Sequence, residues 1–446
     1  MPYLVQKNKG EELNRLYPED RPVNDWYRFV LSYPPHLVRH YISRFELDEK
    51  SAVLDPFCGT GTTLVACKKQ GIKSIGIEAN PVVKFASSVK TDWNIDPDVL
   101  IDHAEIVASK TIDLLLSEGI EDDPLFQPLD KDDPIELRTL NPDQEKLIIT
   151  NSISPKPLHK TLALIEKIHE LKHNRCYNYE RLALAKQLVY TASNLRFGPE
   201  VGVGKAKPDS PVVGPWLAGI RSMCEDLIQV RPNAHIPSVV HFGDARNMKQ
   251  LLEPQSIDAV ITSPPYPNEK DYTRTTRLES VLLGFMTDRH DLRTHKNNLI
   301  RSNTRGVYKI DNDKDWVAKF DSIQKLAEKI ERRRSELNKT SGFEKLYAHV
   351  VRHYFGGMTR HLETLKPILK PGAGLAYVVG DQASYFRILI QTGNLLAEIA
   401  ERLGYKVIDI DLFRKRFSTA TQQYIREEVV LLRWEGQSKG QKYATK

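Results

Sequence analysis

Seven short apolar runs rich in β-branched residues constrain the fold of this chain more than any other feature. They cover residues 52–55, 74–79, 239–245, 258–263, 374–381, 406–413 and 427–434. Runs of this length and composition predict buried strands. Helical patterns lie between several of them, for example at residues 62–70 and 388–404. Strands that alternate with helices predict an α/β fold built on a doubly wound, mostly parallel sheet.

Two intervals between predicted strands are too long for ordinary connections. Residues 95–235 have largely helical patterns, and the second interval includes a charged helical stretch at 316–339. We therefore predict that helical insertions interrupt one core. The predicted core comprises residues 1–94, 236–286 and 361–436, with a helical insertion at 95–235, a basic insertion at 287–360 and a flexible tail at 437–446.

Charge and cysteine usage narrow the class of protein. The 446 residues carry a formal net charge of +6, and residues 287–354 alone have the same excess of Lys and Arg over Asp and Glu, +6. This balance is compatible with a nucleic-acid partner, although a solvated helix face is the plainer interpretation of one charged stretch. The four cysteines form no CxxC pair, so neither a metal site nor a disulfide framework is expected. Without a signal peptide or a membrane span, a cytoplasmic protein is expected.

A glycine-containing loop follows the first predicted strand. Within AVLDPFCGTGTTLVACKKQG (52–71), Gly59 and Gly61 stand between the strand and a helical pattern. Glycine allows a tight turn and a close approach of the backbone to a ligand. A phosphate-binding loop would need the lysine of GxxxxGK[ST], which is missing, and a dinucleotide fingerprint would need a third glycine where Leu64 stands. S-adenosylmethionine is the third interpretation.

The loop DPFCGTGTT (55–63) resembles the DPF-x-G-[ST]-GTT signature of S-adenosylmethionine-dependent amino-methyltransferases of DNA. The resemblance implies a Rossmann-like class I methyltransferase fold, with a seven-stranded mostly parallel sheet, helices on both faces and helical insertions. The acidic residue Glu78 fits the position that binds ribose hydroxyls, and Asp244 fits the motif near the adenine. Residues 27–45 resemble the motif that covers the methionine end. The cofactor-binding residues implied are Asp55, Pro56, Phe57, Gly59, Gly61, Thr62, Glu78 and Asp244. The plainer alternatives are that Asp55 caps a turn and that Glu78 is solvated.

A second motif follows the fourth predicted strand. Ser263, Pro264, Pro265 and Tyr266 match the family's [DNS]-P-P-[YFW] pattern. The implied target is the exocyclic amino group of a base, which is out of reach inside a duplex until the base is extruded. Tyr266 offers an aromatic face for the flipped base. The Pro264 carbonyl and the Ser263 side chain are the expected acceptors for the amino hydrogens, and the two prolines hold them in place before substrate arrives. A proline-rich turn with a packing tyrosine is the alternative.

Within this resemblance, Asp or Asn before PPY goes mostly with adenine N6, and Ser goes mostly with cytosine N4. Ser263 therefore favours cytosine N4. Methylation at cytosine C5 needs a cysteine nucleophile, usually after a proline, and no Pro-Cys pair occurs. The expected function is site-specific methylation of double-stranded DNA in a restriction–modification or related defence system, with cleavage left to a separate restriction endonuclease. The alternatives are an adenine-N6 enzyme, an RNA or protein methyltransferase on the same fold, and a non-catalytic nucleic-acid-binding protein.

Basic residues near the second motif are the candidate DNA contacts. Arg274 and Arg277 follow the motif closely enough to meet phosphates of the target strand. Arg332, Arg333 and Arg334 lie in the basic insertion, which is the predicted DNA-contacting region. The glycine-rich, basic segment 194–211 is interpreted either as a mobile loop that embraces DNA or as an ordinary surface loop.

Overall fold

The computed structural model of the protein describes residues 12–28, 32–126, 136–197, 200–268, 270–418 and 421–436. The predicted tail at 437–446 lies outside these residues. Within them, no helix combines the length and the apolar character needed to cross a membrane.

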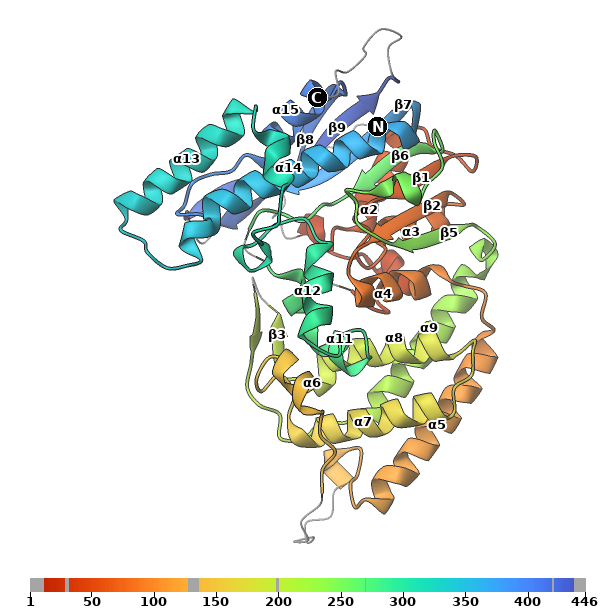
Figure 1. The fold of residues 1–446 in the computed structure, drawn as a ribbon. Coiled ribbons are helices and arrows are strands. Elements are labelled where there is room, and N and C mark those ends of the chain that lie inside the picture. The colour runs from red at the N-terminus through yellow and green to blue at the C-terminus, as the bar shows by residue number, and fades with distance from the viewer. Residues whose placement is uncertain are drawn as a thin grey trace.

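A seven-stranded sheet forms the centre of the upper half of the molecule in Figure 1. Its strand order is β5-β2-β1-β6-β7-β9-β8, and β9 runs antiparallel to both of its neighbours while the pairs from β5 to β7 are parallel. The strands are β1 (Ala52–Asp55), β2 (Lys73–Glu78), β5 (Ser238–Phe242), β6 (Ile257–Thr262), β7 (Leu369–Gly380), β8 (Lys406–Ser418) and β9 (Gln423–Trp434). This confirms the predicted α/β fold and all seven strands.

The last three strands are longer than predicted. β7 begins five residues earlier than the apolar run, and the β8–β9 hairpin extends well beyond the residues that showed an apolar pattern. The additional part of the hairpin is rich in charged side chains, as in the Arg414–Ser418 stretch. Because these residues project past the core, they carry no hydrophobic pattern that would reveal a strand.

Helices cover both faces of the sheet. Val53 of β1 and Ile261 of β6 point to the face covered by α2 (Pro35–Arg44) and α3 (Thr62–Lys69). Their neighbours Leu54 and Val260 point to the face covered by α14 (Tyr347–Leu365) and α15 (Thr392–Arg402). Successive side chains of a strand alternate between faces, so each central strand is apolar throughout. The helices are α1 (Arg21–Asn24), α2 (Pro35–Arg44), α3 (Thr62–Lys69), α4 (Pro81–Thr91), α5 (Pro97–Ser117), α6 (Pro142–Leu147), α7 (Pro155–Glu170), α8 (Tyr177–Gln187), α9 (Val213–Val230), α10 (Tyr272–Thr275), α11 (Arg277–Leu282), α12 (Arg289–Asn297), α13 (Asp321–Glu336), α14 (Tyr347–Leu365) and α15 (Thr392–Arg402).

Helices α5 to α9 form a helical lobe below the sheet in Figure 1. Leu100, Leu164, Leu182 and Trp216 are fully buried in its core, which is continuous with α4. The segment 194–211 contains a pair of antiparallel strands, β3 (Leu195–Phe197) and β4 (Val201–Val203). The sequence prediction missed these strands because three-residue strands bounded by glycines are too short to show an alternating pattern.

The second long interval divides between an outer helix and a core helix. Ile323, Ala327 and Ile330 of α13 are buried at helical spacing, and α13 packs against α14. Although α14 begins within residues 287–360, it covers one face of the sheet. α13 projects at the upper left in Figure 1.

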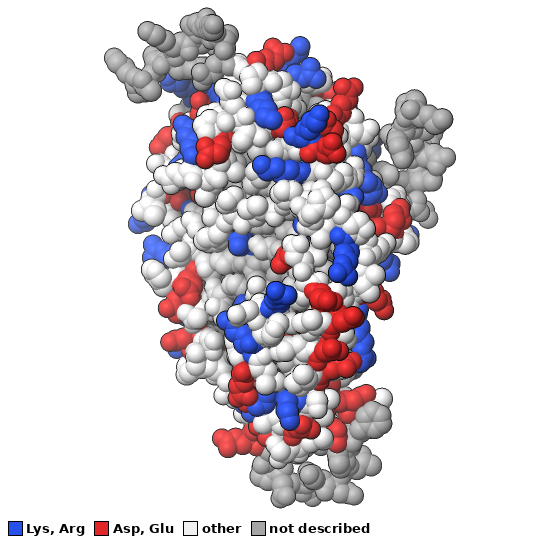
Figure 2. Space-filling model, turned by 90° about the vertical axis from the view of Figure 1, so that its right-hand side faces the viewer, with Lys and Arg blue, Asp and Glu red and all other residues white. Residues whose placement is uncertain are grey.

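Charged side chains are intermixed on the side where β5 and α9 lie. Figure 2 shows blue and red residues side by side near both ends of this face, with a largely uncharged band between them. This face therefore presents no extended surface of one sign of the kind that follows a polyanion.

Candidate active site

A cavity of about 550 Å³ opens beyond the carboxyl ends of β1, β2 and β6. Its lining combines the glycine loop after β1, the end of β2, the Ser-Pro-Pro-Tyr turn after β6, and the β8–β9 hairpin. Ligands of open α/β sheets bind at this edge, because the loops that follow parallel strands converge there. The two motifs identified in the sequence therefore share one space.

The glycine loop depends on two residues with left-handed backbone conformations. Gly59 has φ 52° and Gly61 has φ 86°. A Cβ atom at position 61 would also lie 3.2 Å from the Ser87 Cβ of α4. Thr62 then begins α3. The loop backbone therefore borders the cavity at the N-terminus of a helix, where the helix dipole places a partial positive charge.

Glu78, at the end of β2, is bound to this loop. One carboxylate oxygen accepts a hydrogen bond from the Gly59 N–H at 2.9 Å, and the other accepts one from the Asn80 N–H at 2.8 Å. Burial raises the pKa of Glu78 to about 7. Since Glu78 also lines the cavity, its remaining lone pairs are available to hydroxyl groups of a ligand.

Asp55 lies beneath the cavity and does not line it. Its carboxylate accepts hydrogen bonds from the Thr262 hydroxyl at 2.6 Å, the Tyr33 hydroxyl at 3.0 Å and the Phe57 N–H at 3.1 Å. Burial raises the pKa of Asp55 to about 6. The residue therefore joins the ends of β1 and β6 to the segment before α2.

The predicted cofactor residues divide into two groups. Asp55 and Gly61 shape the loop from outside the cavity lining. The residues that do line the cavity are Pro56, Phe57, Gly59, Thr62, Glu78 and Asp244.

Asp244 is held by a buried arginine. The Arg246 guanidinium contacts the Asp244 carboxylate at 2.6 Å and the Asp313 carboxylate at 2.5 Å. Asp313 begins the short 3-10 helix η8 (Asp313–Val317), which packs against α14. The orientation of Asp244 at the cavity therefore depends on a segment far along the chain.

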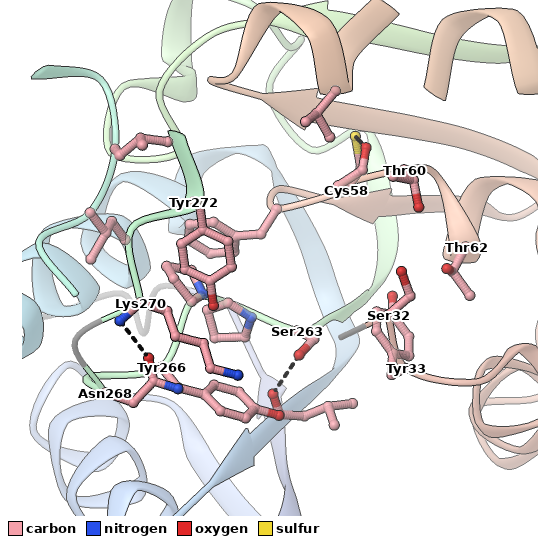
Figure 3. A pocket seen from close by; sticks show the side chains of 18 of the residues that line it. Ser32, Tyr33, Cys58, Thr60, Thr62, Ser263, Tyr266, Asn268, Lys270 and Tyr272 are labelled. Atoms are coloured by element: carbon pink, nitrogen blue, oxygen red, sulfur yellow. Dashed lines mark hydrogen bonds between the residues drawn. The ribbon is translucent and has the colours of Figure 1, made fainter. Parts of the chain in front are cut away.

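The Ser-Pro-Pro-Tyr turn presents acceptors and an aromatic ring to the cavity (Figure 3). The Ser263 hydroxyl donates to the Val378 carbonyl at 3.1 Å, which leaves its oxygen lone pairs for another donor. The Tyr266 ring packs against Gly380, where a Cβ atom would lie 3.1 Å from the ring. The Tyr266 hydroxyl donates to Glu427 at 3.4 Å, and burial raises its pKa, so the phenol is neutral.

Several residues of the cavity were missed by sequence analysis. Lys270 and Tyr272 follow the turn closely, so their proximity to the motif was an available signal. The hairpin residues have no such signal, because only the pairing of β8 with β9 and of β9 with β7 brings them to the site. The missed lining residues include Asn80, Lys270, Tyr272, Phe413, Arg414, Arg416, Phe417 and Glu427.

The arginines predicted to contact DNA differ in their surroundings. The Arg277 guanidinium donates to the Leu147 carbonyl at 3.2 Å and to Thr273 Oγ1 at 3.1 Å, so it joins the segment after the Ser-Pro-Pro-Tyr turn to the helical lobe. The side chain of Arg274 is partly buried.

The three arginines of α13 lie apart from the cavity lining. Arg332 is exposed, while Arg333 pairs with Glu336 at 3.0 Å and Arg334 pairs with Glu331 at 2.6 Å.

Comparisons with known proteins show what this chain is similar to. Residues 3–86 match the model of a DNA methylase family, N6_N4_Mtase. The type II methyltransferase M.BsoBI of Geobacillus stearothermophilus is 27% identical over 457 aligned positions, which cover 93% of this chain and 85% of that protein. M.AvaI, a type II methyltransferase of Anabaena variabilis, is 23% identical over 442 positions, which cover 94% and 86%. M.MjaII of Methanocaldococcus jannaschii is 33% identical over 131 residues, which cover 29% of this chain and 22% of that protein.

Proposed function

We infer that this chain is a DNA methyltransferase of the N4/N6 family. It transfers a methyl group to the exocyclic amino group of a base that is extruded from double-stranded DNA. The target atom that we propose is cytosine N4. One observation carries the proposal: a single cavity contains both the glycine loop with Glu78 and the Ser263–Tyr266 turn. A methyl donor and its acceptor must meet in one space in a defined orientation, and this cavity provides it.

S-adenosylmethionine is the methyl donor that the family implies, and the residues present fit it. The loop around Gly59 exposes backbone to the cavity, and Glu78 has carboxylate lone pairs that suit ribose hydroxyls. Phe57 adds an apolar surface to the cavity that Asp244 also lines. When bound, this cofactor supplies a methyl group that its sulfonium has already activated. Pro56, Phe57, Gly59, Thr62, Glu78 and Asp244 would hold it, with Asp55 and Gly61 shaping the loop.

The turn residues act on the amino group. We propose that Ser263 Oγ and the Pro264 carbonyl accept its two hydrogens, which draws the nitrogen lone pair out of conjugation with the ring. Because the Ser263 hydrogen is directed to the Val378 carbonyl, the oxygen faces the substrate as an acceptor. Tyr266 stacks on the base and stabilises the positive charge that develops on it. Pro264 and Pro265 keep these groups in place between turnovers.

Cytosine N4 is proposed because of the residue before PPY. Most adenine-N6 methyltransferases that this motif resembles have Asp or Asn at this position, whereas this chain has Ser263. We expect N4-methylcytosine when unmethylated genomic DNA is incubated with labelled S-adenosylmethionine and the protein, digested to nucleosides and identified by mass. N6-methyladenine would contradict the base assignment. Methylation of tRNA without methylation of DNA would favour the RNA alternative, and cofactor binding without any product would favour a non-catalytic role.

The proposed DNA contacts follow from charge and exposure. Residues 287–360 are the proposed DNA-contacting region, and within α13 Arg332 is the arginine that has no described carboxylate partner. Arg274 is proposed to meet the target strand beside the cavity, whereas Arg277 supports the site through its contact with Leu147. By analogy with the two type II methyltransferases, we propose that the chain is the modification half of a cytoplasmic restriction–modification system, with a separate endonuclease.

The pKa of Glu78 makes cofactor affinity dependent on pH. A carboxylate with a pKa of about 7 loses its charge as the pH falls below 7, and the protonated group is a poorer acceptor for ribose hydroxyls. Affinity for S-adenosylmethionine is therefore expected to fall between pH 8 and pH 6. Glu78→Gln is expected to bind S-adenosylmethionine about 10–100-fold more weakly at pH 8, because one charge-assisted hydrogen bond is lost. The affinity of this variant is also expected not to depend on pH in this range. Calorimetric titrations at three pH values check both expectations, and an equal pH dependence in Glu78→Gln would assign the effect to another group.

A further inference from the structure

Lys270 is a cation in the cavity that the proposed mechanism leaves without a role. Its side chain lines the cavity together with Ser263, Tyr266 and Tyr272. In Figure 3 it runs from the backbone toward the part of the cavity where Ser263 and Tyr266 lie. Among the described residues, its ammonium takes part in no ion pair. Glu427, the carboxylate of the β8–β9 hairpin that lines the cavity, is instead paired with Arg414. A cation without a protein partner is available to a ligand.

The backbone of Lys270 itself is anchored. Its carbonyl accepts a hydrogen bond from the Asn303 amide at 3.0 Å, and its N–H donates to Asn268 Oδ1 at 3.3 Å. The next residue, Asp271, caps α10 and pairs with Lys296 at 2.9 Å. The backbone from which the Lys270 side chain extends is therefore held in place at the cavity.

The surroundings of the ammonium favour a ligand acceptor. Burial lowers the pKa of Lys270, and the neighbouring Arg416 lowers it further, whereas Glu200 and Glu427 favour the charged form. Arg416 donates one of its N–H groups to the Asp381 carbonyl at 2.7 Å. A partly buried donor that lacks a hydrogen-bond partner gains more from a neutral oxygen acceptor than an exposed lysine does.

The geometry points to Lys270 as the residue that recognises the O2 oxygen of a flipped cytosine. When the amino group lies between Ser263 and the Pro264 carbonyl, the rest of the Watson–Crick edge extends away from the turn. In cytosine this edge continues through N3 to O2, a strong acceptor. In adenine it continues through N1 to a C2–H group, which accepts nothing. A lysine that reaches this end of the base therefore favours cytosine, because its ammonium can donate to O2. When adenine is bound instead, the Lys270 ammonium stays desolvated and has no acceptor.

This inference rests on the proposed function, and its experiment uses the duplex site mapped from the methylated product. The target cytosine is replaced by 2-thiocytosine, whose sulfur is a weaker acceptor than O2 and whose amino group is unchanged. The wild-type protein is expected to methylate the 2-thiocytosine duplex about 10–100-fold more slowly. Lys270→Met is expected to be slowed by a similar factor on cytosine and to treat the two bases alike, while Lys270→Arg, which keeps a donor, retains discrimination.

Each outcome separates the inference from the function on which it rests. N6-methyladenine from the wild-type protein overturns both. N4-methylcytosine with equal wild-type rates on the two bases overturns the recognition of O2 alone, without the need for any variant. A Lys270→Met protein that binds the cofactor normally but keeps the wild-type ratio also overturns it, because Lys270 would then act at another position, for example on a phosphate.

Discussion

Replacing Tyr266 with alanine is expected to lower the rate of methyl transfer about 1000-fold, with a change of less than about threefold in affinity for S-adenosylmethionine. In the proposed mechanism the flipped base stacks on this ring, and base–aromatic stacking contributes about 1–3 kcal/mol. We also propose that this ring stabilises the charge that develops on the base, and removing one such stabilising group costs about 100–1000-fold in rate. Single-turnover rates on the mapped duplex measure the loss, and calorimetry measures cofactor binding.

Tyr266→Phe is the matched control. It keeps the ring against Gly380 and removes only a hydroxyl whose bond to Glu427 is long, at 3.4 Å. A loss of less than about tenfold is therefore expected, because Glu427 keeps its pair with Arg414. If the phenylalanine variant loses as much activity as the alanine variant, the hydroxyl and not the ring carries the function.

The sequence predicts the catalytic core well because its strands are buried on both faces. Such strands show as continuous apolar runs, and the motifs follow directly at their carboxyl ends. Since β1, β2 and β6 are parallel neighbours, the residues after them meet at one edge of the sheet, which brings Glu78 and the Ser263 turn to one cavity. Local pattern and sheet topology together are sufficient for this part of the site.

Other parts of the site depend on pairing between distant segments. Arg416 and Glu427 reach the cavity only because β8 pairs with β9 and β9 pairs with β7, and no local pattern encodes that order. In the same way, Arg277 resembles a free phosphate ligand in the sequence, but its bond to the Leu147 carbonyl exists only in the folded chain. Prediction therefore fails where a side chain's partner comes from a remote segment.

Gly356→Ala is expected to lower the free energy of unfolding by about 1–3 kcal/mol. A Cβ atom at position 356 of α14 would lie 1.9 Å from the carbonyl oxygen of Asp313 and 2.5 Å from its carbonyl carbon. Both are backbone atoms of η8, which no side-chain rotation can move, so the segment itself must shift. The gain in helix propensity, about 1 kcal/mol, offsets only part of this cost.

Gly357→Ala tests whether the clash, and not the loss of a helical glycine, is responsible. At position 357 the nearest atoms to a Cβ are Asp313 Oδ2 and Ile300 Cγ2, both at 3.4 Å, which is ordinary contact. This variant is expected to be as stable as the wild type or slightly more stable in urea unfolding. Because Asp313 holds Arg246, and Arg246 holds Asp244 at the cavity, Gly356→Ala should also weaken cofactor binding, whereas Gly357→Ala should not. Equal stability of the two variants would mean that η8 moves at no cost and that α14 does not fix the orientation of Asp244.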